Sequence, residues 1–257
     1  YSTLMMGVPT FYTRLIKDKR LDKSLTKNMK LFISGSAPLL TETHQDFYNI
    51  TGHQILERYG MTETNMNTSN PFDGERKAGS VGKPLKDISI RINKTKGDKD
   101  TVLNKIGMIE IKGPNVFKGY LNNPEKTQEA FTEDGYFITG DIGHFDKDGY
   151  LFISGRNKDL IISGGFNVYP KEIEDVINQH KSVIESAVFG IKDNDLGEVP
   201  IAAVVMINDN KEIKDLSVFV ENNLVKYKIP KKYIVLNELP KNVMGKVQKN
   251  ILKDKYS

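Results

Sequence analysis

Short apolar runs separated by glycine turns mark the first third of the chain. Residues 31–34 form a candidate buried strand, and they run into the small residues of 35–38. Ile55 and Leu56 are typical of the end of the next buried strand. Between them, residues 41–51 predict a helix with Thr41 as its N-cap. A strand, a helix and a strand imply a parallel sheet, whose loops at the carboxyl ends bind ligands in open α/β folds.

The middle of the chain changes to a period of two. Residues 88–92 and 107–111 alternate apolar and polar side chains, which predicts two strands joined by a lysine-rich surface loop over 93–104. A third strand is expected over 135–141, ending in Gly140 and Asp141, and a fourth returns over 150–153. We therefore predict a small, mostly β subdomain over 81–154, after an α/β part over 1–80.

The last hundred residues mix helices and strands. Residues 155–158 are interpreted as a hinge, and 159–257 as a separate α+β domain. Pro170 opens a helix with one apolar face, and a second helix is expected over 213–226. The strands are expected over 160–162, 186–191, 201–207 and 233–236, with a loop over 240–246.

Composition narrows the class of protein. The chain is 38% hydrophobic and 27% charged, which is ordinary for a soluble globular protein, and no apolar run is long enough to cross a membrane. The absence of cysteine excludes disulfides and thiolate chemistry and fits a cytoplasmic protein, while a mitochondrial location stays open because the chain begins at Tyr1. Its net charge of +4 is spread along the chain, which argues against nucleic acid as a partner.

Residues 58–64 contain several side chains that could bind a ligand. Gly60 allows a turn that a side chain would hinder, and the hydroxyl of Thr62 can bind a phosphate oxygen. Glu63 is a hard oxygen ligand suited to magnesium shared with phosphates. Arg58 offers a planar fork for a carboxylate or phosphate. The alternative is an ordinary polar exit from a strand.

Other residues add to this picture only in combination. Gly35-Ser36-Ala37 can lie flat against a purine or a small acyl group. Asp141, at a predicted strand end, is placed to accept hydrogen bonds from a ribose diol, and Arg156 could assist it. Lys246 is a mobile cation able to stabilise charge that grows on a phosphate. Singly, each residue is more often a turn or surface residue.

In this order and spacing, several segments resemble the adenylate-forming enzymes, which include acyl-CoA synthetases, luciferase-like ligases and peptide-synthetase adenylation domains. The segments are SGSAPL (34–39), YGMTET (59–64), YFITGD (136–141), GRNKDLIISGGFNVYPKEIE (155–174) and PKNVMGKVQK (240–249). The likeness is closest to malonyl-CoA synthetases, through MMGVPTFYTRL (5–15), ERYGMTETNMNTSNP (57–71) and GMIEIKGPNVFKGY (107–120). It implies an α/β fold: part of the large adenylate-forming domain, followed by a small, mobile α+β domain.

The resemblance also implies a reaction and its residues. A carboxylate attacks the α-phosphate of ATP to give an acyl-adenylate and pyrophosphate, and coenzyme A then forms the thioester and releases AMP. Glu63 is implied to ligate Mg²⁺, Lys158 to act as hinge, and Ser163-Gly164-Gly165 to make room for the arm of CoA. The residues implied to contact ATP or AMP are Gly35, Ser36, Ala37, Tyr59, Gly60, Met61, Thr62, Asp141, Arg156 and Lys246.

The acid substrate is the most open part of the interpretation. The resemblance implies that Arg58 holds the far carboxylate of malonate, with Ser36 and Arg14 as further candidates, and methylmalonate stays possible. The alternatives are that Arg58 pairs with Glu57 or Glu63, that the acid is a medium-chain or aryl acid, or that the chain only binds nucleotide. The phosphate loop TSGTTGxPKG, which these enzymes carry upstream, is absent from the sequence, so we expect a fragment that is inactive alone.

Overall fold

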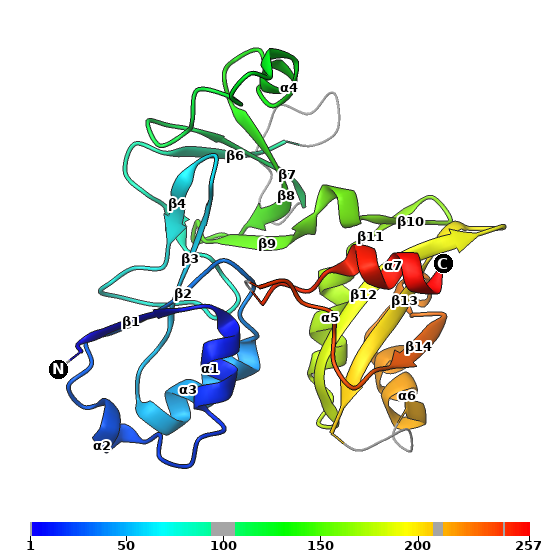
Figure 1. The fold of residues 1–257 in the computed structure, drawn as a ribbon, viewed down its shortest axis with the longest axis horizontal. Coiled ribbons are helices and arrows are strands. Elements are labelled where there is room, and N and C mark those ends of the chain that lie inside the picture. Colours follow the sequence, from blue (N-terminus) through cyan, green and yellow to red (C-terminus); the bar gives the residue numbers. More distant parts are fainter. Residues whose placement is uncertain (1, 94–105, 208–212, 244) are drawn as a thin grey trace. The chain divides into compact units, whose positions relative to one another are not determined.

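The computed structural model describes residues 2–93, 106–207, 213–243 and 245–257, in two compact units over Tyr1–Ile153 and Ser154–Ser257. Figure 1 shows the elements of each unit. Most of the predicted lysine-rich loop, residues 94–104, and Met244 of the predicted loop over 240–246 lie outside the described residues. Within them, no helix is long and apolar enough to cross a membrane.

The first unit opens on a five-stranded sheet in the order β1-β2-β3-β4-β5. Its strands are β1 (Leu4–Gly7), β2 (Leu31–Ser34), β3 (Leu56–Met61), β4 (Asn65–Ser69) and β5 (Lys83–Pro84). β1, β2 and β3 are parallel, whereas β4 and β5 are antiparallel to their neighbours. The predicted strand–helix–strand unit with a parallel sheet is confirmed, since α3 (Thr41–Thr51) connects β2 to β3.

Helices cover this sheet through an aromatic core. α1 (Pro9–Leu15) and α3 lie together in Figure 1, and α2 (Lys23–Thr26) is a single turn. The ring of Phe47 on α3 lies 5.4 Å from that of Tyr12 on α1 and 4.9 Å from that of Phe32 on β2. Edge-to-face packing of this kind fixes the helices against the strands that carry the site.

The predicted N-cap of α3 is wrong by one residue. Leu40 is the cap, because its carbonyl accepts from the amide of His44 and the first helical turn closes there. His44 of α3 is buried, and its Nε2 lies 3.1 Å from the carbonyl oxygen of Ile55.

His44 is expected to contribute to the pH dependence of the free energy of unfolding. Burial lowers the pKa of His44, so the folded protein binds its proton more weakly than the unfolded chain does. The free energy of unfolding should therefore fall as the pH drops below about 6.5, the usual pKa of histidine. Denaturant unfolding at about pH 5 and pH 7.5 should show a smaller difference for His44→Gln than for the native protein. Equal pH slopes would contradict the assignment.

A second, four-stranded sheet follows in the order β6-β7-β8-β9. Its strands are β6 (Ser89–Asn93), β7 (Gly107–Lys112), β8 (Phe137–Phe145) and β9 (Leu151–Arg156), and α4 (Pro124–Glu129) precedes β8. The mostly β character is as predicted, but β8 does not end at Asp141. It continues to Phe145, since Ile142 and Gly143 still pair with Met108 and Gly107 of β7. Likewise Gly155 and Arg156, the first two residues of the predicted hinge over 155–158, belong to β9.

The second unit is an α+β domain around a sheet in the order β11-β10-β13-β12, with β14 beside β13. The strands are β10 (Ile161–Ser163), β11 (Phe166–Val168), β12 (Val183–Asp193), β13 (Gly197–Met206) and β14 (Lys232–Val235). The helices are α5 (Pro170–Asn178), α6 (Ile213–Asn223) and α7 (Lys249–Tyr256), with short helices η1 (Asn157–Asp159) and η2 (Lys226–Lys228). The sequence did not lead us to expect β11 and α7.

Both faces of this sheet are buried by helices. Ala202 and Val204 of β13 pack with α5 and α6, whereas Ile201 and Ala203 pack with Leu252 of α7. Successive side chains of a strand point to opposite faces, so β13 reads as a continuous apolar run and not as an alternating one. The core of the second unit therefore consists of two layers on either side of one sheet.

Candidate active site

The β3–β4 hairpin carries most of the predicted site. We expected a strand that ends near Leu56 and a loop after it, but β3 continues through Met61 and the polar turn is only Thr62–Thr64. Gly60 lies inside the strand, where a Cβ would come within 2.0 Å of the carbonyl oxygen of Asn65. Glycine is therefore required here by the close approach of β4, not by a loop.

Arg58 lies on β3 behind this turn. Its Nη1 donates to the sulfur of Met66 at 3.3 Å, and its buried Nε has no hydrogen-bond partner among the described residues. Neither Glu57 nor Glu63 forms an ion pair with it in the described part of the chain, although both were alternatives from the sequence. A thioether is a weak acceptor, so the guanidinium keeps donors for an anion.

Gly35 makes room for this arginine. A Cβ at Gly35 would lie 3.3 Å from the carbonyl oxygen of Arg58 and 3.4 Å from its Cγ. The structure thus brings Gly35 and Arg58 together. Ser36 has a left-handed φ of 68° and an exposed side chain, which turns the chain sharply after β2. Arg14 is exposed in the last turn of α1, and no hydrogen bond joins it to Arg58 among the described residues.

Glu63 and its neighbours form the polar tip of the hairpin. Thr62 is exposed and Glu63 is half-buried, so both can reach a ligand. One carboxylate oxygen of Glu63 accepts a hydrogen bond from the hydroxyl of Tyr120 at 3.3 Å. Burial and this carboxylate raise the pKa of Tyr120, which keeps the phenol protonated and a donor. Sequence reasoning assigned no role to Tyr120, although it ends a segment (107–120) that carries the resemblance.

Tyr59 and Asp141 join the two sheets of the first unit. The hydroxyl of Tyr59 donates to Oδ2 of Asp141 at 2.5 Å, and both side chains are buried. The backbone amide of Asp141 donates to Thr139 Oγ1, whose hydroxyl donates to the carbonyl of Ile109. Asp141 is therefore held inside β8, 82 positions along the chain from its partner.

The remaining predicted residues belong to the second unit. Lys246 is exposed beside a turn in which its amide donates to Oδ1 of Asn242 and its carbonyl accepts from the amide of Asn242. Arg156 ends β9, and Lys158 lies in η1.

The predicted CoA-binding turn is only partly open. The side chain of Ser163 is 2% exposed, so it does not line the surface. Gly164 and Gly165 are exposed with left-handed φ angles, and the amide of Gly164 donates to the carbonyl of Leu196. The two glycines, not the serine, present this turn to solvent.

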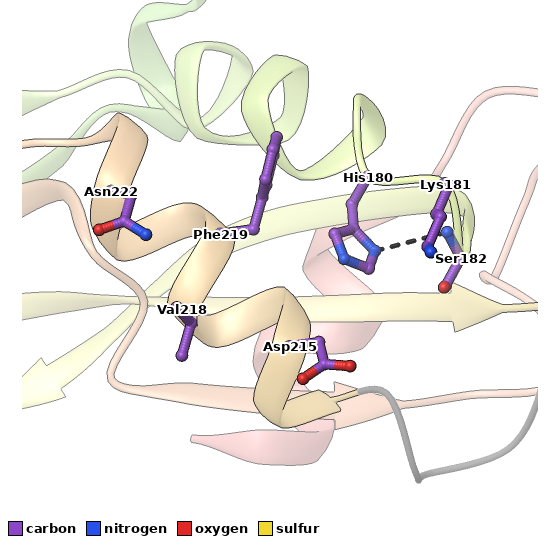
Figure 2. A pocket seen from close by; sticks show the side chains of 7 residues that line it. All are labelled: His180, Lys181, Ser182, Asp215, Val218, Phe219 and Asn222. Carbon is purple, nitrogen blue, oxygen red and sulfur yellow. Dashed lines mark hydrogen bonds between the residues drawn. The ribbon is translucent and has the colours of Figure 1, made fainter.

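The second unit also contains a pocket. Figure 2 shows it between the α5–β12 connection and α6. Its volume is about 430 Å³. It is lined by His180, Lys181, Ser182, Asp215, Val218, Phe219 and Asn222. The ring centroids of His180 and Phe219 lie 5.4 Å apart, so these two lining residues also pack against each other. None of the site residues predicted from the sequence lines it.

Comparisons with known proteins match both units. A model described as AMP-binding enzyme matches residues 2–121, and one described as AMP-binding enzyme C-terminal domain matches residues 172–246. The chain belongs to the AMP-binding enzyme family. A malonate–CoA ligase of Arabidopsis thaliana is 41% identical to it, over 98% of this chain and 44% of that protein. A long-chain-fatty-acid–CoA ligase of Bacillus subtilis is 37% identical, over 95% of this chain and 44% of that protein.

Solved structures of AMP-binding enzymes confirm the predicted fold. The crystal structure of ATP-bound MatB from Rhodopseudomonas palustris is 53% identical, with a TM-score of 0.95 over 99% of this chain and 51% of that chain. The chain thus spans about half the length of the relatives it matches. Its α/β architecture, with an α+β C-terminal unit, is that of the adenylate-forming enzymes.

The side chains at the hairpin tip fit a Mg²⁺ ion that is bound together with the phosphates of a nucleotide. The described residues contain no cluster of three or more acidic or histidine side chains that could hold a metal alone. Mg²⁺ in nucleotide sites is usually bound through one or two carboxylates together with substrate phosphates. Glu63, whose side chain has one long hydrogen bond, from Tyr120, within the part of the chain that the structure describes, can be such a carboxylate.

Proposed function

We propose that the protein is an acid–thiol ligase that activates a small carboxylic acid, with malonate favoured, at the expense of ATP. The acid is converted first to an acyl-adenylate, with release of pyrophosphate. The sulfur of coenzyme A then attacks the acyl carbon, and AMP leaves. The family membership and the names of the similar CoA ligases support this chemistry.

Arg58 is the observation that favours malonate. Its guanidinium has no carboxylate partner among the described residues, and its Nε is buried without any partner. A buried charged donor that lacks a partner is costly, and a planar fork binds a carboxylate through two parallel bonds. The second carboxylate of malonate or methylmalonate would supply this partner, whereas the tail of a monocarboxylate would not. The name of the Arabidopsis relative agrees with this choice.

We assign the other roles within the same proposal. Glu63 would hold Mg²⁺, which would neutralise charge at the phosphates, and Thr62 would contact a phosphate oxygen. Gly35, Ala37 and Met61 line the nucleotide, while Asp141 and Arg156 hold its ribose. Ser36 and Arg14 stay weaker candidates for the acid pocket, since neither forms a hydrogen bond with Arg58 among the described residues.

The second unit is proposed to serve the two half-reactions in turn. Lys246 stabilises the carboxylate and α-phosphate during adenylation, as a cation placed where charge develops. Lys158 acts as the hinge about which the unit rotates between the halves. Gly164 and Gly165, with their open surface, leave room for the arm of coenzyme A.

Substitution of Arg58 tests the substrate. With Arg58→Met in the full-length protein, kcat/KM for malonate should fall about 100-fold, because a charge-assisted pair is lost. The rate with octanoate should stay the same or rise. Arg58→Lys keeps the positive charge but not the planar fork, so its kcat/KM for malonate should lie between the values of the native protein and Arg58→Met. The readout is CoA-dependent AMP release with malonate, methylmalonate, acetate and octanoate side by side.

Other outcomes separate the alternatives. Octanoate or an aryl acid ahead of malonate in the native protein would keep the ligase and reject the malonate assignment; the fatty-acid ligase of Bacillus subtilis makes this the second candidate. No AMP release with any acid, together with retained ATP binding, would indicate a protein that only binds nucleotide.

A further inference from the structure

Glu63 is held in place by the segment of residues 115–120, which lies between β7 and α4. The backbone amide of Phe117 donates to the carbonyl oxygen of Glu63 at 2.8 Å. The hydroxyl of Tyr120 donates to Oε1 of the same residue at 3.3 Å. One short segment therefore holds both the backbone and the side chain of Glu63, although it follows Glu63 by more than fifty positions in the chain.

The same segment also holds the residues after Glu63. The side-chain amide of Asn115 donates to the carbonyl oxygens of Thr64 at 2.5 Å and Met66 at 3.2 Å, and to Oδ1 of Asn67 at 3.0 Å. Thr64 and Asn67 are fully buried. An amide that bonds the last residue of the turn and the first part of β4 restricts how far the hairpin tip can move.

The segment is itself anchored to its own subdomain. The ring of Phe117 packs at 4.9 Å against Tyr120, at 5.9 Å against Phe131 and at 5.4 Å against Phe137. The amide of Tyr120 donates to Oγ1 of Thr127 at 2.9 Å. Aromatic packing and this hydrogen bond fix the ring of Tyr120, so its hydroxyl approaches Glu63 from a set direction.

We propose that residues 115–120 form a brace for the hairpin tip, and that Tyr120 is a positioning residue that orients the Glu63 carboxylate toward magnesium-bound nucleotide. This inference rests on the proposed magnesium role of Glu63. The phenol bonds Oε1 of Glu63, and no described residue donates a hydrogen bond to Oε2, so that oxygen would be available to a metal ion. Hydrogen bonds from neighbouring side chains to a metal-binding residue orient that residue and contribute substantially to metal affinity.

The test is Tyr120→Phe in the full-length protein, with Tyr136→Phe as the matched control. Tyr136 lies in the same subdomain and its hydroxyl bonds only the exposed Ser89 among the described residues. Calorimetry should follow the binding of ATP with and without MgCl₂, and the Mg²⁺ concentration for half-maximal AMP release should be measured. We expect Tyr120→Phe to raise that concentration about tenfold and to weaken only the Mg²⁺-dependent part of ATP binding. The control and the thermal midpoint should stay near the native values.

A double-mutant cycle with Glu63→Gln makes the inference falsifiable. If Tyr120 acts through Glu63, the effect of Tyr120→Phe on Mg²⁺-dependent ATP binding should disappear in the Glu63→Gln background. An unchanged Mg²⁺ requirement in Tyr120→Phe, or an effect that persists in Glu63→Gln, would overturn the role of Tyr120. If the native protein released no AMP with any acid, the proposed function would be rejected instead. The ATP-binding measurements would still decide the role of Tyr120.

Discussion

Lys246→Ala is expected to lower the rate of acyl-adenylate formation by about 10²–10³-fold, the usual effect of removing one preorganised donor to a developing anion. Thioester formation from supplied acyl-adenylate should remain near the native rate, because the α-phosphate has already been attacked in that half-reaction. Pyrophosphate exchange with malonate measures the first half, and CoA consumption from synthetic malonyl-adenylate measures the second. The split between the two rates is the diagnostic result.

The surroundings of Lys246 explain why it is suited to this role. Two other lysines nearby are already paired with carboxylates, since Lys241 lies 2.6 Å from Glu185 and Lys249 lies 2.6 Å from Glu174. Lys246 has no ion pair among the described residues and is exposed. Its backbone amide and its carbonyl are nevertheless both hydrogen-bonded to Asn242, so the position of its Cα is constrained.

Lys241→Ala is the matched control for this experiment. It removes a cation from the same turn, and the loss of a partly exposed ion pair costs at most about 1 kcal/mol. Both half-reactions should therefore stay within a few-fold of native. Equal losses of adenylation and thioester formation in Lys246→Ala would contradict the role, because they would indicate that the turn has been disrupted as a whole.

The elements that could be predicted from the sequence are those with a strong local pattern. The strand over 31–34 and the helix over 41–51 have the predicted bounds, since apolar spacing and turn residues delimit them. The amphipathic helix that begins at Pro170 is likewise confirmed. These elements also place the segments of the resemblance, so the fold class and the family followed from local signals.

The strands that carry the site were harder to delimit. β3 contains Glu57 and Arg58, which look like the polar exit of a strand. Glu57 is nevertheless only 5% exposed and accepts a hydrogen bond from the amide of Gly79, a partner that no local pattern reveals. For the same reason the pairing of Tyr59 with Asp141 and the brace on Glu63 were missed: each joins residues more than fifty positions apart. Local periodicity cannot identify contacts of this kind.

Gly60 shows how such a distant approach fixes a residue type. The register of β3 against β4 shifts between Tyr59 and Gly60, and this irregularity presses the backbone of Asn65 onto the Gly60 position. A Cβ there would lie 2.0 Å from the Asn65 carbonyl oxygen and 3.2 Å from the Cα of Met66. Both neighbours are backbone atoms, so no side-chain rotation can relieve the collision.

Gly60→Ala is therefore expected to destabilise the first unit by about 3 kcal/mol, at the upper end of the usual cost of overpacking. The hairpin must open to admit the methyl group, which moves Thr62 and Glu63 together, so adenylation should fall by about 100-fold even where the protein stays folded. Thermal unfolding and pyrophosphate exchange, both in the full-length protein, measure the two effects.

Gly149→Ala separates this collision from a general effect of losing glycine. Gly149 has a left-handed φ of 79°, but a Cβ there would meet no atom within 4 Å. Its substitution should cost only the backbone strain of about 1–2 kcal/mol and leave adenylation intact, because the turn lies between β8 and β9. If Gly60→Ala were no more damaging to stability or adenylation than Gly149→Ala, the close approach of Asn65 would not be what positions Glu63. Greater damage would show that the hairpin register itself places the proposed magnesium ligand.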